Sequence, residues 1–335
     1  MENKWQNEIQ QRWNQLLLTG NQAVVDWEQV DLSNDFMFFH VFQDEKRTLE
    51  LMRRIFPELD ITAVRLHEQE VRKEDKEGKG IRIDLFVAGH SVLGEADYVV
   101  EMQTENTGDL GYRIRYYKSL VDLGSLRSGG SYLKLKKCFI VMICTFDMFG
   151  KHWRRYDFEE RCIQDPKIRL ENGVQTTILN TKGTQQPDME TEIDVNPALT
   201  VKRADGEDIT LKRGQLGEPL KNFLDYLNGK EITGEAFIDD LDRAVKEARK
   251  NTELRQEYMM MVMDKLVEYD RGEMRGIAIG EKRGIVIGEK RGKVLGAIEN
   301  MRDDGKTESE IKARIMKKYG LDEKTAEDYI NGRVA

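Results

Sequence analysis

The chain has 335 residues and a formal net charge of −8, with 39% hydrophobic and 34% charged residues. This composition is typical of a globular protein with room for two or more domains. It argues against permanent residence on nucleic acid through a uniformly basic surface, and no apolar run approaches the roughly 18 to 20 residues of a membrane span.

The cysteine and histidine residues point away from zinc and from an oxidising compartment. Cys138, Cys144 and Cys162 are an odd number of cysteines without metal-ligand spacing, and the four histidines are scattered. The N-terminus lacks the apolar core of a signal peptide. We therefore expect free thiols and a cytoplasmic protein.

Two helices are expected at the start of the chain. Residues 1–30 contain an amphipathic N-terminal helix, over 1–18, which Gly20 ends. A second helix is predicted from Asp35 to Phe56, since Ser33 to Asp35 offers N-cap side chains and Pro57 follows. This helix carries Glu50, for which two interpretations stay open: an acid that faces a metal, and a surface residue in a salt bridge.

Two strands joined by a hairpin are predicted after a first strand at 61–72 and a charged turn at 73–79. Apolar and polar residues alternate over Gly80–Val87 and again over Tyr98–Gln103, and Gly94 lies in the turn between them. Antiparallel pairing of these strands would bring Asp84 next to Glu101, with Gln103 on the same face.

Two converging carboxylates repel each other unless a cation or protons compensate them. Hard oxygen ligands of this kind suit Mg²⁺, which can activate a water and stabilise charge on a phosphodiester. The pattern of Asp84, Glu101 and Gln103 is therefore compatible with phosphodiester hydrolysis. The alternative is that both acids are solvated on the open face of a hairpin.

The next elements are a helix at 109–126 and a buried strand at 137–146, which is nearly continuous in apolar residues. Further strands at 156–162 and 174–180 should extend the sheet. On the helix, Arg113 could hold a DNA phosphate or orient a ligand carboxylate, and the alternative is an ion pair with Asp109.

A basic segment overlaps this helix. Between Arg113 and Lys137 there are seven basic residues and one acidic residue. Either these side chains contact nucleic-acid phosphates or they form a solvated helix face. The residues expected to contact nucleic acid are Arg115, Lys118 and Arg127.

The rest of the chain is predicted to be a loop region at 186–217 followed by helices. A helical region at 218–270 should contain helices at 218–227 and 238–268. Residues 271–298 repeat RGIAIGEK with a period of eight and a glycine every four residues, which suits either a helix packed on a partner or a flexible tether. Residues 299–335 should form a small helical hairpin, and a homo-oligomer through these C-terminal helices is expected.

Six blocks of the chain carry a resemblance to a known family. They are NDFMFFHVFQDE (34–45), GIRIDLFV (80–87), YVVEMQT (98–104), RIRYYKSLVD (113–122), CFIVMICTFDMFG (138–150) and ILNTKG (178–183). Together these blocks resemble the PD-(D/E)XK nuclease superfamily, in particular the Rpn-like group of recombination-promoting nucleases and transposases. The similarity extends from about Asp31 to about Gly292.

The resemblance implies an α/β fold with a restriction-endonuclease-like core at 31–185, in the order helix, three strands, helix, strand, with an extended sheet and an α-helical C-terminal region. It also implies Asp84 and Glu101 as ligands of Mg²⁺, for which Mn²⁺ can substitute, with the Met102 carbonyl as a further ligand. Gln103 stands where the superfamily name places a Lys; a Gln can orient a water but brings no positive charge.

Three functions follow as hypotheses. The first is a Mg²⁺-dependent DNA endonuclease associated with recombination, mobile elements or defence, in which Gln103 places the water. The second is a catalytically weak or inactive nuclease fold that binds nucleic acid or protein, motivated by the missing Lys and the acidic charge. The third is a nuclease that acts on RNA.

Overall fold

The structure is a computed structural model that describes residues 26–67, 83–126, 129–187, 198–202, 208–212, 214 and 216–333. The predicted N-terminal helix at 1–18, the charged turn at 73–79 and Arg127 lie outside these residues. The chain divides into two compact units, Met1–Met259 and Met260–Ala335.

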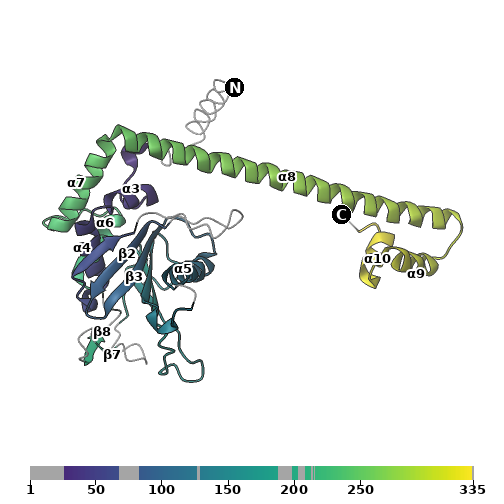
Figure 1. Cartoon of the computed structure of the whole chain (residues 1–335). Coiled ribbons are helices and arrows are strands. Elements are labelled where there is room, and N and C mark those ends of the chain that lie inside the picture. Colours follow the sequence, from purple (N-terminus) through teal and green to yellow (C-terminus); the bar gives the residue numbers. More distant parts are fainter. Residues whose placement is uncertain are drawn as a thin grey trace. The chain divides into compact units, whose positions relative to one another are not determined.

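A six-stranded mixed sheet forms the centre of the first unit (Figure 1). Its order is β1-β2-β3-β4-β6-β5. The β2–β3 pair is antiparallel, whereas β3–β4 and β4–β6 are parallel, so the carboxyl ends of β3, β4 and β6 lie at one edge. The strands are β1 (Ala63–Leu66), β2 (Leu85–Ser91), β3 (Gly94–Gln103), β4 (Lys137–Cys144), β5 (Arg155–Phe158) and β6 (Val174–Asn180).

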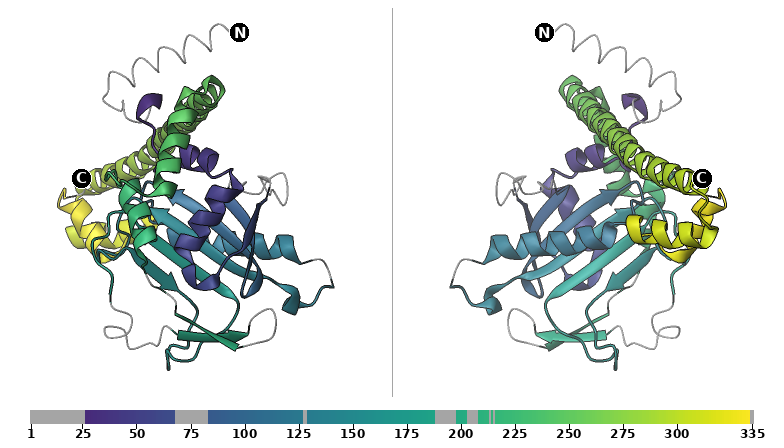
Figure 2. Two further views of the ribbon diagram at one scale, coloured as in Figure 1. Left: turned by 90° about the vertical axis from the view of Figure 1, so that its left-hand side faces the viewer. Right: turned by 90° about the vertical axis from the view of Figure 1, so that its right-hand side faces the viewer.

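Helices cover both faces of this sheet (Figure 2). On one face, α5 (Leu110–Ser125) packs Ile114 and Tyr117 against Val99 and Ile140. On the other face, the Phe56 ring lies 5.8 Å from that of Tyr98 and 5.1 Å from that of Phe139. The apolar sequence of β4 follows from this double coverage, and the predicted helix, three strands, helix and strand are confirmed.

The single helix predicted at 35–56 is wrong, because the chain forms two helices there: α3 (Asp35–Val41) and α4 (Glu45–Ile55). Between them, the Asp44 side chain accepts hydrogen bonds from the backbone N–H groups of Lys46 and Arg47 at 2.9 and 3.0 Å. This N-cap begins α4 anew. The short 3₁₀ helices are η1 (Trp27–Gln29), η2 (Pro57–Leu59) and η3 (Tyr132–Lys134).

The segment expected to be a loop at 186–217 contains an antiparallel hairpin, β7 (Ala198–Lys202) with β8 (Asp208–Lys212). Its register pairs Leu199 with Leu211 and Val201 with Ile209. In the sequence, apolar and polar residues alternate over 199–202 and over 208–212, a pattern that favours paired strands over an irregular loop.

The helices that follow begin as predicted and then differ at one position. α6 (Glu218–Leu227) has the expected bounds, whereas the helix predicted at 238–268 divides at Asn251 into α7 (Ala236–Lys250) and α8 (Thr252–Asp303). The Asn251 side chain accepts hydrogen bonds from the N–H groups of Glu253 and Leu254 at 2.9 and 3.2 Å. The α8 helix continues through the glycine repeat, which is therefore helical.

The second unit ends in the predicted helical hairpin, α9 (Glu308–Tyr319) and α10 (Glu323–Ile330). Thr307 and Glu310 form a capping box at the start of α9, and Gly320 ends it with a left-handed φ of 65°. A small core joins these helices to the end of α8 through Val294, Ile298, Ile311, Ile315 and Ala326. Among the described helices, none combines the length and the apolar character that a membrane span requires.

Candidate metal-binding site

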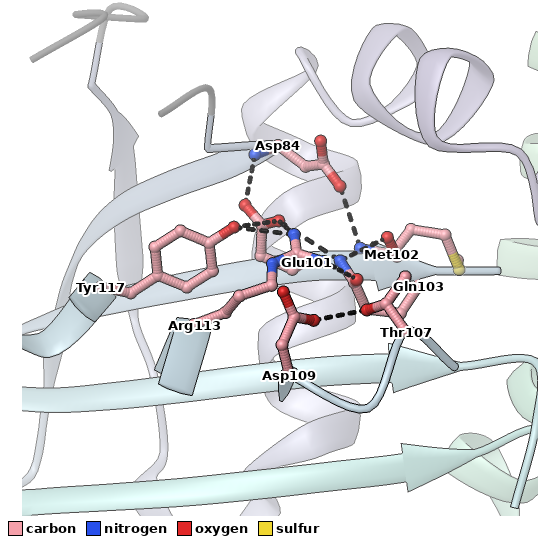
Figure 3. A network of polar contacts seen from close by, with 8 residues as sticks. All are labelled: Asp84, Glu101, Met102, Gln103, Thr107, Asp109, Arg113 and Tyr117. Carbon is pink, nitrogen blue, oxygen red and sulfur yellow. Dashed lines mark hydrogen bonds and ion pairs between the residues drawn. The ribbon is translucent and has the colours of Figure 1, made fainter. Parts of the chain in front are cut away.

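Two acidic residues meet across the β2–β3 pair (Figure 3). The register places Leu85 opposite Val100, so Asp84, one residue before β2, comes opposite Glu101. The N–H of Asp84 donates to Glu101 Oε1 at 2.8 Å, and the N–H of Met102 donates to Asp84 Oδ2 at 2.9 Å. These reciprocal hydrogen bonds hold both carboxylates at the carboxyl end of β3.

The environment of Glu101 disfavours its negative charge. Its exposed fraction is 2%, and burial together with the nearby Asp84 carboxylate raises the pKa of Glu101 well above its ordinary value. A positive charge beside the pair would offset both effects. The site is therefore suited to a cation.

Gln103 lies on the same face as Glu101 and is buried. Its Nε2 donates to the Met102 carbonyl at 2.8 Å and lies 3.5 Å from Glu101 Oε2. Its Oε1 accepts a hydrogen bond from Arg113 Nη1. Because a guanidinium can only donate, this contact determines which end of the amide faces the carboxylate.

Two side chains of α5 complete the network. Arg113 Nη2 donates to the Tyr117 hydroxyl at 2.9 Å and lies 3.6 Å from Glu101 Oε2. The Tyr117 hydroxyl in turn donates to Glu101 Oε2 at 3.1 Å. Tyr117 is not among the site residues predicted from the sequence. The signal was present, since a spacing of four places it on the same helical face as Arg113.

The donor set fits a hard divalent cation. Asp84, Glu101 and the Met102 carbonyl offer oxygen ligands, and Mg²⁺ is commonly held by one or two carboxylates with waters and phosphate oxygens. The Met102 carbonyl also accepts the Gln103 amide. Over the described part of the chain, no group of three or more His, Cys, Asp or Glu residues could hold a metal, so a ligand set here would depend on water or substrate.

The remaining predicted residues lie elsewhere or are less directly connected. Glu50 forms an ion pair with Arg54 at 3.1 Å, one turn further along α4. Arg115 is exposed on α5 with its guanidinium 5.5 Å from the centre of the Tyr112 ring, and Lys118 is half-buried on the same helix. For all three, a role at the site stays a prediction.

The basic segment at 113–137 does not form one cluster. Lys137 pairs in register with Ala96 at the start of β3, whereas Gln103 pairs with Cys144 at the other end of the same strands. Nearby, Lys136 forms an ion pair with Glu95 at 3.0 Å. Lys136 and Lys137 therefore lie at the end of the β3–β4 pair opposite to Asp84 and Glu101.

Comparison with known proteins identified one family. A family model described as PD-(D/E)XK nuclease family transposase matches residues 32–201. No curated protein and no solved structure matches the chain.

Proposed function

The chain belongs to the PD-(D/E)XK nuclease family transposases, and from this premise we propose that it is a Mg²⁺-dependent DNA endonuclease. Mn²⁺ is the expected substitute. The roles in recombination, mobile elements or defence that the family name suggests are part of the same proposal.

The observation that carries the proposal is the cross-strand pair of Asp84 and Glu101. Both side chains accept a backbone N–H from the opposite strand, at 2.8 and 2.9 Å, which fixes two carboxylates side by side. Two carboxylates held side by side repel each other, and a divalent cation bound between them removes this repulsion. The proposed ligands are Asp84, Glu101 and the Met102 carbonyl.

A bound Mg²⁺ would supply Lewis-acid polarisation of a phosphate oxygen and a more acidic water. The protein side chains prepare the site for this chemistry. Asp84 and Glu101 supply negative charge from two adjoining strands, and the Gln103 amide donates hydrogen bonds beside them, where it can orient a water. Arg113 holds the other end of that amide.

Contact with the DNA backbone is proposed for the exposed side of α5. Arg115 is exposed and Lys118 is half-buried there, and basic side chains of this kind bind phosphates through charge without reading sequence. Arg127, which belongs to the same basic segment of the sequence, is proposed to contact the DNA backbone as well.

The test uses Asp84→Asn and Glu101→Gln, because each amide can still accept the cross-strand N–H while it removes a charge. We expect both variants to unfold like the wild type and to cleave plasmid DNA at least about a hundredfold more slowly, which corresponds to about 2.7 kcal/mol. Metal affinity, measured by calorimetry with Mg²⁺ and Mn²⁺, should fall in parallel.

The matched control is Asp239→Asn, which removes one carboxylate from the exposed first turn of α7. Its cleavage should equal that of the wild type. Wild-type cleavage rates in both site variants would remove the catalytic assignment. RNA of the same sequence, run in parallel, decides between the two nucleic acids.

The alternative is a catalytically weak nuclease fold that acts as a binding module. It is favoured by Gln103, whose position in the pattern belongs to a Lys, and whose amide donates to the Met102 carbonyl that the metal would use. The calorimetric titration separates the two functions. An absence of Mg²⁺ and Mn²⁺ binding in the wild type, with DNA present, would support the binding module.

The proposal includes a cytoplasmic location and a homo-oligomer. The three thiols of the chain are free, as expected in a reducing compartment. Large apolar side chains of α8 are exposed, which is a common feature of surfaces that meet another chain. They include Met274, Ile277, Ile279, Ile285, Val286 and Ile287.

A further inference from the structure

We propose that Arg113 is the positioning residue of this site, and that it carries on α5 the positive charge that a Lys at position 103 would carry on β3. The inference rests on the proposed function and extends it to the residues that replace the motif Lys. It follows from the closed set of contacts among Glu101, Gln103, Arg113 and Tyr117.

Gln103 and Arg113 are in direct contact. Arg113 Nη1 donates to Gln103 Oε1, so the amide nitrogen is directed to Glu101 Oε2 at 3.5 Å and to the Met102 carbonyl at 2.8 Å. A Lys at position 103 would bring an ammonium against this guanidinium. Because two neighbouring cations repel each other, a neutral residue 103 that can accept a hydrogen bond suits the Arg at position 113 better than a Lys does.

Arg113 also forms an ion pair with Glu101. The guanidinium lies 3.6 Å from Glu101 Oε2, and the Tyr117 hydroxyl links the two by accepting from Arg113 at 2.9 Å and donating to Glu101 at 3.1 Å. Arg113 and Tyr117 are four residues apart on one helix, so their spacing is fixed by the backbone. The Arg113 guanidinium is therefore held beside Glu101 Oε2, the same carboxylate oxygen that faces the Gln103 amide.

The net charge of the site depends on residue 103. With Gln at position 103 and both carboxylates ionised, as they are when they ligate a cation, Asp84, Glu101 and Arg113 carry one net negative charge, which favours a divalent cation. A second cation at position 103 would remove that charge. The side chain of Arg113 is 33% exposed, so part of this side chain faces solvent, from where a phosphate can approach it.

The experiment compares Gln103→Lys, Arg113→Gln and the double variant that exchanges the two functions. In the metal-free protein, we expect Gln103→Lys to lower the urea midpoint of unfolding, since two cations then face each other. The double variant should restore most of that loss. Calorimetry with Mn²⁺ should show at least a tenfold weaker affinity for Gln103→Lys and a return to within about threefold of the wild type in the double variant.

Cleavage provides a separate measurement. We expect Arg113→Gln to keep the Mn²⁺ affinity of the wild type or to exceed it, while kcat on plasmid DNA falls at least tenfold. The double variant should recover kcat to within about tenfold of the wild type. Arg243→Gln, which removes an exposed cation from α7, is the control for charge alone.

Two results would overturn the inference. One is a double variant that stays as impaired as Gln103→Lys in both unfolding and Mn²⁺ affinity. The other is an Arg113→Gln protein that cleaves at the wild-type rate. A wild-type protein that binds Mn²⁺ without cleaving nucleic acid would contradict the proposed function instead, and the first two measurements would still decide whether Arg113 and Gln103 form a charge-matched pair.

Discussion

Single residues show how the first unit holds buried charge at two ends of one strand. Near the end of β3, Glu101 has a guanidinium 3.6 Å away and a tyrosine hydroxyl at 3.1 Å. Near the start of β3, Asp97 is also buried, but its Oδ1 has no hydrogen-bond partner in the described part of the chain, and Lys136 Nζ lies 3.9 Å from it. The same kind of group is therefore compensated to different degrees.

Asp97 should make stability depend on pH. Burial raises the pKa of Asp97 above its ordinary value, so the folded state binds the proton more tightly than the unfolded state. Stability from this group is present at low pH and is lost as pH rises from about 3.9 through the raised value, at about 1.4 kcal/mol for each pKa unit. Asp97→Asn lacks this loss and should become more stable relative to the wild type as pH increases.

The measurement is the free energy of unfolding in urea for both proteins between pH 4.5 and 8.5. The charges of Lys136, His67 and Glu95 contribute to the pKa of Asp97. These three residues are the same in both proteins, so the difference between the two free energies reports the replacement at residue 97. A difference that stays constant over this range would show that Asp97 does not titrate abnormally.

At the scale of elements, caps and glycines determine where helices start, stop and pack. Asp44 and Asn251 each begin a new helix within a segment whose apolar periodicity runs on. Glycine lowers the stability of a helix interior, and α8 has a glycine at every fourth position of its repeat. The helix is nevertheless continuous from Thr252 to Asp303.

Replacing Gly276, Gly280 and Gly284 by Ala should stabilise α8. A Cβ added at each position would meet no atom within 4 Å, and each exchange favours the helix by about 1 kcal/mol. We expect a higher thermal midpoint for the helical signal at 222 nm in circular dichroism. Gly183→Ala is the contrasting variant, because its Cβ would lie 2.6 Å from the Trp153 carbonyl oxygen, and it should destabilise the first unit.

Sedimentation of the same glycine variants tests the proposed oligomer. If these glycine positions pack closely against a second copy, the added methyl groups will dissociate the oligomer and lower the helical signal. That result would contradict the stabilisation expected for α8 alone and would support a packed interface.

For the whole molecule, the division into two units separates the candidate site from the C-terminal helices. The four side chains around Glu101 and the core of the sheet lie within Met1–Met259, whereas Val294, Ile298, Ile311, Ile315 and Ala326 form a core of their own in the second unit. Each unit therefore has the apolar contacts that a separate fold requires.

A chain that ends after residue 270 should keep the metal-binding properties of the full chain. Tyr258 is buried against Trp27 and Phe36, and this truncation retains it. We expect cooperative unfolding and an Mn²⁺ affinity within about threefold of the full-length value, measured by calorimetry. Loss of affinity in a folded fragment would mean that the site depends on residues after 270.

Local features of this protein follow directly from its amino-acid sequence. Alternation over 80–87 and 98–103 predicted that Asp84 and Glu101 would be opposite each other, because antiparallel pairing follows from a short turn and a period of two. The sequence also predicts the buried strand β4 and the capping box at Thr307, because each depends on residues that are close together in the chain.

The side chains that surround the carboxylates are set by the packing of elements that lie far apart in the sequence. Arg113 and Tyr117 reach Glu101 because α5 crosses back over the sheet, and the distance between these groups depends on packing rather than on sequence spacing. Lys136 and Lys137 belong to the same basic segment of the sequence as Arg113, yet they lie at the opposite end of the β3–β4 pair. Local periodicity determines which face a side chain takes, and the packing of helix on sheet determines what it meets there.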